Sequence, residues 1–424
     1  MNKHSASREL LHLFLEWLMG TAGVLGSLFC LITAFQLISF AQVIFVEDGI
    51  NYFAATILAI YLLIEWGWSI TSSFVLRKSS PAIEFVAFFL TGIGLAVVAS
   101  KGTSSLFTQF LAVALGFALY IALLWMLANV DRVEKFHMPM EVIAIGLLAI
   151  GLIFASNKNG AYNWVQIGGF SFQPSEIVKI AFIFVGAATL EKIQTTKHIT
   201  RYAIFAVICI GLLFLMRDLG TALIFFFTFV VLGFMRSGDV RTILFVILAA
   251  GMAAVLVVLI KRNYVMNRFA TYRHIWDTPY GNGMQQTRVL TYSVSGGLLG
   301  MGIGKGKLRN VFAAVEDLIF GVVAEEWGLI IAFIVALAYI VIFVHSVRNA
   351  KGSRSAFYSI ASVAAGSLLI FQAALNIFGV TDLLPMTGVT LPFVSRGGSS
   401  TISCWGLLAF IKAADNRTWA GRKS

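Results

Sequence analysis

Apolar stretches long enough to cross a lipid bilayer recur along the whole of this 424-residue chain. A transmembrane helix needs roughly 20 consecutive apolar residues, and it satisfies its backbone hydrogen bonds within its own segment. Only 12% of the residues are charged, whereas a soluble domain carries about 25%. The sequence therefore predicts an all-α polytopic membrane protein.

The lengths of the apolar stretches predict about twelve transmembrane helices. The expected spans are 18–46, 50–76, 83–100, 105–128, 140–155, 176–190, 201–216, 219–235, 241–261, 317–345, 355–376 and 399–413. One long polar loop, 262–316, separates the ninth span from the tenth.

The basic residues indicate the direction in which the spans run. If the N-terminus is cytoplasmic, every predicted cytoplasmic segment carries at least two Lys or Arg, and the short outer loops carry one or none. This bias is the positive-inside rule, so we expect both termini in the cytoplasm, with a basic tail at 414–424. The net charge of +11 is then mostly an orientation signal, and nucleic-acid binding is not expected.

The predicted outer loop 262–316 is also basic, and it contains Arg262, Arg268, Arg273, Arg288, Lys305, Lys307 and Arg309. Long translocated loops are largely exempt from the charge rule, so the topology stands. The loop is either an ordinary solvated segment or a site for an anionic partner such as a lipid-linked pyrophosphate, because Arg and Lys pair strongly with phosphate oxygens.

This topology places four polar segments on the same outer side, namely 156–175, the pair Arg217-Asp218, 262–316 and 377–398. Polar backbone and ionisable groups persist at membrane depth only where protein or a water-filled cavity surrounds them. We therefore expect one cavity that opens outward. Segments scattered between the two faces would have favoured a transporter instead.

Five stretches in a fixed order carry the most specific signal. They are NGAYNWVQIGGFSFQPSEIVK at 159–179, DLGT at 218–221, GNG with GGLLGMGIG within 281–304, EDLIFGVVAEEWG at 316–328, and LLPMTGVTLPFVSRGGSS at 383–400, with Gln372 and Asn376 just before the last. A glycine repeat alone would be a poor fingerprint, because no strand precedes it and no helix follows it directly.

Together the five stretches resemble the motifs of the SEDS family (shape, elongation, division, sporulation). The resemblance covers about residues 81–413, and the family core has ten helices, so residues 1–80 would add an N-terminal tail and two further spans. The family polymerises the glycan strands of peptidoglycan from lipid II at the outer face of the bacterial cytoplasmic membrane. The resemblance thus implies a glycosyltransferase of cell shape, elongation or division, with a class B penicillin-binding transpeptidase as partner.

The chain departs from the family pattern at four places. Asn163 stands where the family has Arg, Met216-Arg217 replace Gln-Pro, and Val315-Glu316 replace His-Thr. The catalytic aspartate of the family normally precedes a proline in the long loop. That position is Thr278 here, and the acid Asp277 lies one residue earlier.

Glycan polymerisation requires a base near the attacking sugar hydroxyl and cations near the departing pyrophosphate. By the resemblance, and as the only aspartate of the long loop before Asp317, Asp277 is the predicted catalytic base. The structural alternative for Asp277 is a turn residue before Pro279. His274 is an alternative base of suitable ordinary pKa, and Thr278 is a fallback with a poor basic group.

The predicted substrate-binding residues are Glu176, Lys179, Arg217, Asp218, Arg273, Arg288, Glu325, Ser395, Arg396 and Ser399. Each has a structural alternative. Glu176 and Lys179 lie three residues apart on one helix and could form a scaffolding ion pair, and Asp218 could cap a helix. At most one of the adjacent Glu325 and Glu326 is expected to face a cavity. Arg396 could bind phosphate with its neighbouring backbone N–H groups, or lock its own loop.

No cofactor is evident in the sequence, and no residue cluster has the spacing of a metal site, although the family resemblance allows a divalent cation. The alternative functions are a lipid II flippase, a catalytically weak scaffold that regulates a cell-wall synthase, and an O-antigen-type ligase or polymerase. The LPFVSRGGSS element argues against the last of these. The sequence assigns no role to the two extra helices, and docking of a partner or regulation is one hypothesis.

Overall fold

In the computed structural model, the described residues are 23–46, 49–75, 80–154, 156–158, 161–167, 170–191, 196–241, 272–281 and 283–415, together with positions 244 and 251. The expected ninth span at 241–261 lies almost entirely outside the described residues, as do the first part of the basic loop with Arg262 and Arg268 and most of the tail 414–424.

The described part of the chain is mostly helical. The helices before the long loop are α2 (Gly23–Ile44), α3 (Tyr52–Val75), α4 (Ala82–Ala99), α5 (Thr103–Leu127), α6 (Val130–Phe154), α7 (Pro174–Glu191), α8 (Thr196–Leu215) and α9 (Leu219–Ser237). The later ones are the 3-10 turn η1 (Ile275–Asp277), α12 (Met284–Ser295), the 3-10 turn η2 (Leu308–Asn310), α13 (Ile319–Glu326), α14 (Gly328–Lys351), α15 (Ala356–Val380) and α16 (Gly398–Ala413).

Short strands occupy two of the connections. β1 (Phe45–Val46) pairs antiparallel with β2 (Gly49–Ile50) between α2 and α3. β3 (Ser156–Lys158), β4 (Ala161–Ile167) and β5 (Phe170–Phe172) form a three-stranded antiparallel sheet between α6 and α7, in the order β3-β4-β5. The described residues of 156–175, predicted as a polar outer segment, therefore belong mostly to strands and the start of α7.

Eight of the described helices are long and apolar enough to cross a membrane, namely α2 to α6, α9, α14 and α15. Three other expected spans correspond to α7, which carries Glu176, Lys179 and Glu191, to α8 and to the 16-residue α16. The prediction of an all-α multi-pass membrane protein is confirmed. The number twelve stays a prediction.

The expected tenth span, 317–345, is not one helix. The helix is interrupted between α13 and α14. There Gly328 has a φ of +87°, and an added Cβ would lie 2.3 Å from the carbonyl oxygen of Leu298. Only glycine adopts this conformation without strain. The sequence reads as continuous because α13 is also apolar, but its side chains are buried against α12 and α15 rather than in lipid.

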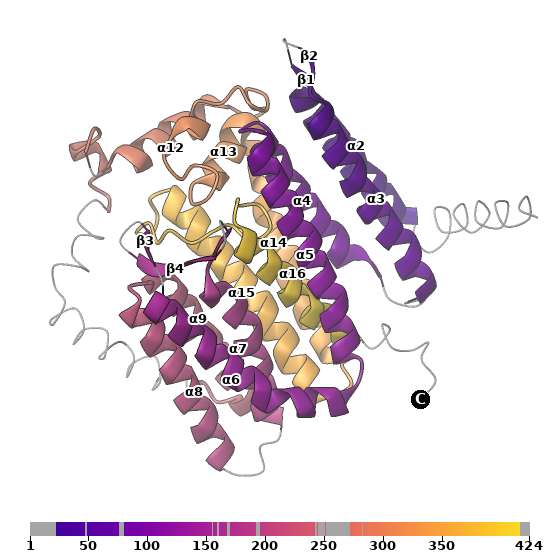
Figure 1. The fold of residues 1–424 in the computed structure, drawn as a ribbon, viewed down its shortest axis with the longest axis vertical. Coiled ribbons are helices and arrows are strands. Elements are labelled where there is room, and N and C mark those ends of the chain that lie inside the picture. The colour runs from indigo at the N-terminus through magenta and orange to yellow at the C-terminus, as the bar shows by residue number, and fades with distance from the viewer. Residues whose placement is uncertain are drawn as a thin grey trace, which may run out of the picture.

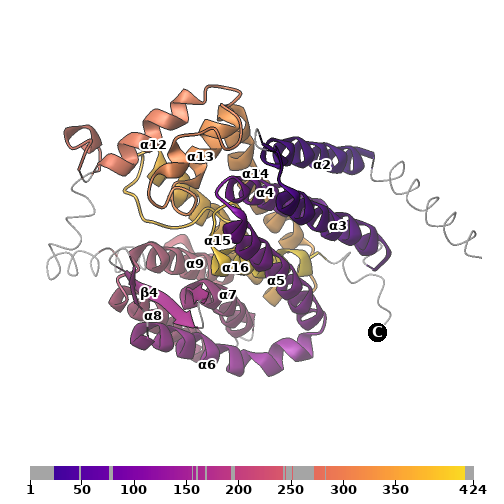
Figure 2. The same cartoon turned by 45° about the horizontal axis from the view of Figure 1, so that its top comes forward.

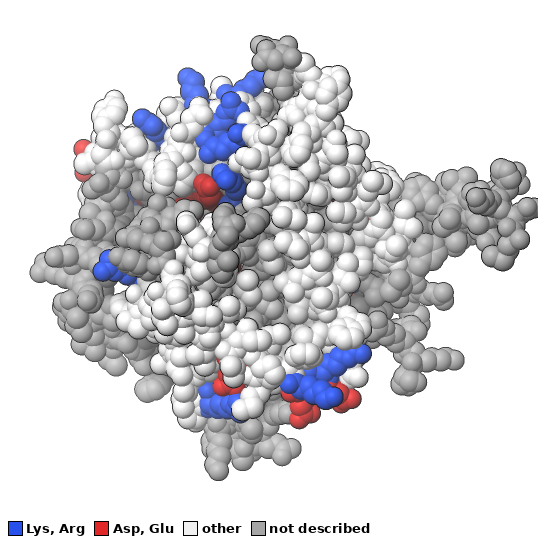
Figure 3. Space-filling view, viewed as in Figure 1, with Lys and Arg blue, Asp and Glu red and all other residues white. Residues whose placement is uncertain are grey.

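The bundle has three regions, which Figures 1 and 2 show from two directions. Helices α15 and α16 run through its middle, with α6 to α9 on one side and α2 to α5 on the other. Helices α12 and α13 cover one end. Figure 3 shows that most charged side chains of the visible face gather at its two ends, with a broad uncharged belt between them. Such a belt suits the hydrocarbon core of a bilayer.

Candidate functional site

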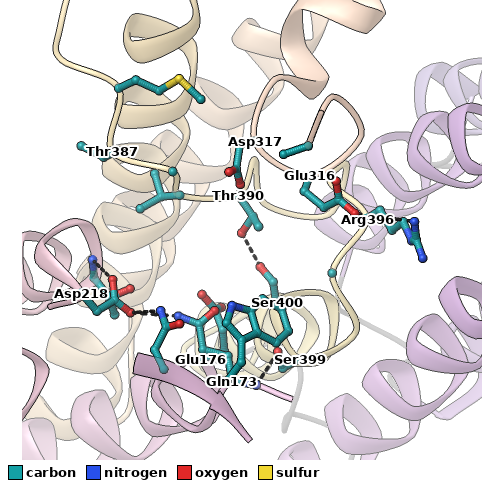
Figure 4. A pocket seen from close by; sticks show the side chains of 18 of the residues that line it. Gln173, Glu176, Asp218, Glu316, Asp317, Thr387, Thr390, Arg396, Ser399 and Ser400 are labelled. Carbon is teal, nitrogen blue, oxygen red and sulfur yellow. Dashed lines mark hydrogen bonds and ion pairs between the residues drawn. The ribbon is translucent and has the colours of Figure 1, made fainter. Parts of the chain in front are cut away.

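A polar cavity of about 790 Å³ lies at the end of the bundle that carries α12 and the three-stranded sheet. Figure 4 shows its acidic and hydroxyl side chains facing one another from several elements. Residues within all five stretches contribute to its wall, although the third contributes only Gln285 and Gln286, between its two glycine elements. The lining residues include Asn163, Gln173, Glu176, Arg217, Asp218, Gln285, Gln286, Glu316, Asp317, Thr390, Arg396, Ser399 and Ser400. The expectation that separate polar segments surround one cavity is therefore met by the described residues.

The segment 381–397 forms much of one wall, and side chains of the neighbouring helices hold its backbone. Gln372 Nε2 donates to the carbonyl oxygen of Thr390 at 2.9 Å, and Asn376 Nδ2 donates to that of Val389 at 2.8 Å. Tyr339 donates its hydroxyl to the carbonyl oxygen of Pro392 at 2.7 Å. These side chains supply hydrogen bonds to carbonyl oxygens of an irregular segment, which has no helical partners and could find none in lipid.

Three helices point their amino ends at this cavity. The first turn of α7, the N-cap of α9 and the first residues of α16 all belong to its wall. A helix amino end carries unpaired N–H groups and a partial positive charge, so it favours anions. This explains why Glu176 occupies the first turn of α7 and Asp218 the N-cap of α9, and it makes the same region suitable for a phosphate group.

Glu176 and Lys179 form a buried ion pair, as the structural alternative for these residues supposed. Lys179 Nζ lies 2.7 Å from Glu176 Oε1 and donates to Gln372 Oε1 at 2.8 Å. Only Glu176 of the two lines the cavity, with Lys179 behind it. Glu176 Oε2 has no hydrogen-bond partner among the described residues, so this oxygen can accept from a bound molecule.

Asp218 caps α9 and is held in place from two other elements. Its Oδ1 accepts from the backbone N–H of Thr221 at 3.1 Å. Its Oδ2 accepts from Asn163 Nδ2 at 2.8 Å and from Gln173 Nε2 at 2.9 Å. Arg217 lies beside it in the left-handed region, with a φ of +59°, and its exposed side chain belongs to the cavity wall.

Arg396 and Glu316 face each other across the cavity rim. Their closest nitrogen and oxygen atoms lie 3.6 Å apart, and each side chain is 38% exposed, so water screens the attraction. The backbone N–H of Arg396 donates to the carbonyl oxygen of Val315 at 2.8 Å, and Ser395 Oγ donates to that of Glu316. Ser395 itself lies outside the cavity wall, whereas Ser399 lines it.

Besides Lys179 and Ser395, four predicted site residues lie outside the cavity wall. Asp277 ends η1 with its side chain 72% exposed, and its Oδ2 lies 3.2 Å from Nδ1 of His274. Arg273 and Arg288 are exposed on the long loop. Glu325 is buried, and its carboxylate accepts from the backbone N–H groups of Lys307 and Leu308. In this conformation the predicted base, Asp277, is therefore not part of the cavity wall.

Sequence reasoning did not select several wall residues as candidates. Asn163 and Glu316 were noted as departures from the family pattern, and each of them contacts a predicted site residue. Gln173 and Asp317 lie within the motif stretches themselves. Their membership in those stretches was the signal that could have identified them.

The described residues contain no group of three or more His, Cys, Asp and Glu side chains that could hold a metal ion. The cavity carboxylates also have other partners, since Glu176 pairs with Lys179 and Glu316 with Arg396. These residues do not fit a resident divalent cation, and the cation allowed by the family resemblance stays a prediction.

Residues 82–418 match the profile of the family FTSW_RODA_SPOVE, described as cell cycle protein. The chain belongs to the FtsW/RodA/SpoVE family. The resemblance seen in the motifs is therefore confirmed. The match begins after α3, so α2 and α3 of this FtsW/RodA/SpoVE member precede it.

Curated relatives of this FtsW/RodA/SpoVE member are named for division and sporulation. The chain is 30% identical over 296 residues to the probable peptidoglycan glycosyltransferase FtsW of Wigglesworthia glossinidia brevipalpis, covering 68% of this chain and 77% of the relative. It is 30% identical over 350 residues to the stage V sporulation protein E of Bacillus subtilis, covering 76% and 94%.

Solved structures have the same fold. A chain of a peptidoglycan synthase complex superposes with a TM-score of 0.68 at 23% identity, covering 80% of this chain and 98% of that one. The rod shape determining protein RodA of Thermus thermophilus superposes with a TM-score of 0.60 at 25% identity, covering 79% and 95%. The helical core of the FtsW/RodA/SpoVE family is therefore conserved in this chain.

Proposed function

We propose that this chain is a peptidoglycan glycosyltransferase, which polymerises lipid II into glycan strands at the outer face of the bacterial cytoplasmic membrane for cell shape, elongation or division. The observation that carries the proposal is that one polar cavity is lined by residues of four family-like motif stretches, together with Gln285 and Gln286 from within the fifth. The names of the relatives agree with this activity. With the positive-inside orientation, both termini are cytoplasmic and the cavity end faces outward.

In this reaction a sugar hydroxyl of one substrate attacks the anomeric carbon of the other. The bond to undecaprenyl pyrophosphate breaks, and the pyrophosphate leaves with the bonding electrons while a base takes the proton of the hydroxyl. Asp277 is the proposed base. It lies on η1, shortly before α12, whose Gln285 and Gln286 line the cavity.

The remaining site residues divide by charge. Arg217 and Arg396 lie in the wall, near the amino ends of α9 and α16, and would bind the pyrophosphate. The exposed cations Arg273 and Arg288 would attract it from the loop.

The acceptor side chains suit the other part of the substrate. Glu176, Asp218 and Ser399 would accept from sugar hydroxyls. Lys179, Ser395 and Glu325 would support them from behind the wall, because their contacts hold helices and loops rather than the cavity surface.

A class B penicillin-binding transpeptidase is the proposed partner. The support for it is the similarity in fold to a chain of a peptidoglycan synthase complex. A catalytically weak scaffold is the second candidate function, because Asp277 is exposed and outside the cavity wall.

The test is polymerisation of labelled lipid II by the purified full-length protein, with and without the cognate transpeptidase. We expect glycan polymer, with more of it when the partner is present. A folded protein that yields no polymer under either condition would make the scaffold or the flippase the better account.

A further inference from the structure

The hairpin of α2 and α3 lies outside the residues of the family match and packs against the core through α4. Phe29 of α2 contacts Phe85 of α4, with ring centroids 4.5 Å apart. Gln36 lies against Gly92, where an added Cβ would approach its side chain to 3.0 Å. Tyr61 of α3 donates its hydroxyl to the carbonyl oxygen of Phe88 at 2.6 Å. These contacts fix the hairpin beside α4.

At the β1 end of α2, two polar side chains reach a different part of the core. Gln42 Oε1 accepts from the backbone N–H of Ile303 at 2.9 Å, and Ser39 Oγ accepts from Trp327 Nε1 at 3.1 Å. Figure 1 shows this end of the hairpin at the same end of the molecule as α12 and α13. The hairpin therefore holds the glycine-rich segment 296–306 and the junction of α13 with α14.

The glycine-rich segment 296–306 is joined to that junction by its own backbone. Met301 N–H donates to the carbonyl oxygen of Glu325, and Gly302 N–H donates to that of Glu326, both at 3.0 Å. Gly300 has a φ of +82°, and an added Cβ would lie 2.3 Å from the carbonyl oxygen of Glu326. So close a fit joins the segment directly to the junction.

Glu325 links the junction of α13 with α14 to the residues that lead into the cavity wall. Its carboxylate accepts from the backbone N–H groups of Lys307 at 2.7 Å and Leu308 at 2.9 Å, which start η2. The residues that follow η2 turn into the cavity wall, where Phe312, Glu316 and Asp317 line it.

We propose that Gln42 is a positioning residue: through its hydrogen bond to Ile303 it holds the glycine-rich segment, and with it the wall that carries Glu316 and Asp317, in the geometry needed for activity. The two helices that precede the family core thus contribute to the site. This inference rests on the proposed function for its effect on polymerisation, whereas its structural half can be measured without any activity.

The test compares three variants of the full-length protein. Gln42→Met removes the acceptor at similar length, Gln42→Glu keeps an acceptor oxygen, and Thr56→Ala is the matched control on the hairpin. Thr56 is exposed, and its hydroxyl donates to the carbonyl oxygen of Tyr52 in its own helix. Amide hydrogen exchange is followed over 296–317, and lipid II polymerisation gives kcat and KM.

In Gln42→Met we expect exchange to be about five- to tenfold faster over 296–317, the effect of losing one hydrogen bond on local opening. We expect kcat to fall several-fold with KM little changed, because the wall is misplaced in the bound complex while substrate contacts remain. Gln42→Glu and Thr56→Ala should match the wild type in both measurements.

Unchanged exchange in Gln42→Met would overturn the inference whatever the activity. Faster exchange confined to 296–306, with normal kcat, would also overturn it, since the wall would then be independent of the segment. A wild-type protein that made no polymer would contradict the proposed function alone, and exchange over 311–317 would still decide whether Gln42 positions the wall.

Discussion

Lys179 and Glu176 form an ion pair one turn apart on α7, with Nζ 2.7 Å from Oε1 and both side chains almost fully buried. Such a pair is held in place mainly by the cost of leaving either charge alone in an apolar environment. Glu176 also belongs to the cavity wall, and its Oε2 has no hydrogen-bond partner among the described residues. The pair therefore stabilises the fold, and Glu176 also lines the cavity. Substitutions can separate these two roles.

Lys179→Met should destabilise the protein by about 3 kcal/mol, because it leaves the carboxylate of Glu176 buried without its cation. Adding Glu176→Gln should restore much of that loss, since the double variant has no unpaired charge. Polymerisation should stay low in the double variant, because the acceptor carboxylate is gone. Thermal unfolding in detergent and the lipid II assay measure the two effects. Recovery of both would show that Glu176 has only the structural duty.

Arg217 holds a backbone conformation with a φ of +59°, which costs an L-residue roughly 1–2 kcal/mol. Arg217→Gly should leave stability nearly unchanged, because glycine relieves this strain but loses more entropy on folding. Arg217→Pro, which introduces the residue usual in the family, should destabilise by about 3 kcal/mol or more, since proline fixes φ near −65°.

The rate of polymerisation distinguishes the effect of the charge of Arg217 from the effect of its backbone conformation. Arg217→Gly should polymerise lipid II about tenfold more slowly, and Arg217→Lys should retain most of the rate, because an ammonium also attracts phosphate. A wild-type rate in Arg217→Gly would mean that the guanidinium does not contact the pyrophosphate.

Glu326 gives a pH dependence to stability. Burial raises the pKa of its carboxyl from the ordinary 4.5 to about 7, and the neighbouring Glu325 adds to this, while the N–H groups of Gly304 and Gly306 and the charge of Arg309 oppose it. A raised carboxyl pKa means that the folded state binds the proton more tightly than the unfolded state. Its contribution is complete below pH 4.5 and is lost as the pH rises to about 7.

Unfolding free energy should accordingly fall by up to about 3 kcal/mol as the pH rises through that window. Glu326→Gln should remove this part of the slope, because the amide does not titrate. Thermal unfolding of both proteins across the window tests the prediction. Parallel curves would assign the slope to other groups.

The sequence was sufficient for the class of protein and for most of the cavity. Long apolar stretches identify spans because lipid requires them, and the outer polar segments had to share a cavity because lipid excludes them. Glu176, Arg217, Asp218, Arg396 and Ser399 therefore came together as expected.

Other features depend on tertiary contacts that a local pattern does not encode. The break before Gly328 is hidden because α13 is apolar on account of burial against protein. Glu325 looked like a cavity acid, yet its carboxylate caps η2. The hydrogen bond between Gln42 and Ile303 joins residues 261 positions apart, and the periodicity of α2 does not predict it.

The most direct measurement of the central claim is polymerisation of labelled lipid II by the wild type beside Asp277→Ala and Thr278→Ala. Both side chains are exposed, so both variants should fold normally. We predict polymer from the wild type and from Thr278→Ala, with a loss of about a hundredfold or more in Asp277→Ala, as expected for removal of a general base. Full activity in Asp277→Ala would contradict the assignment of the base, and no polymer from the folded wild type with its partner would contradict the function itself.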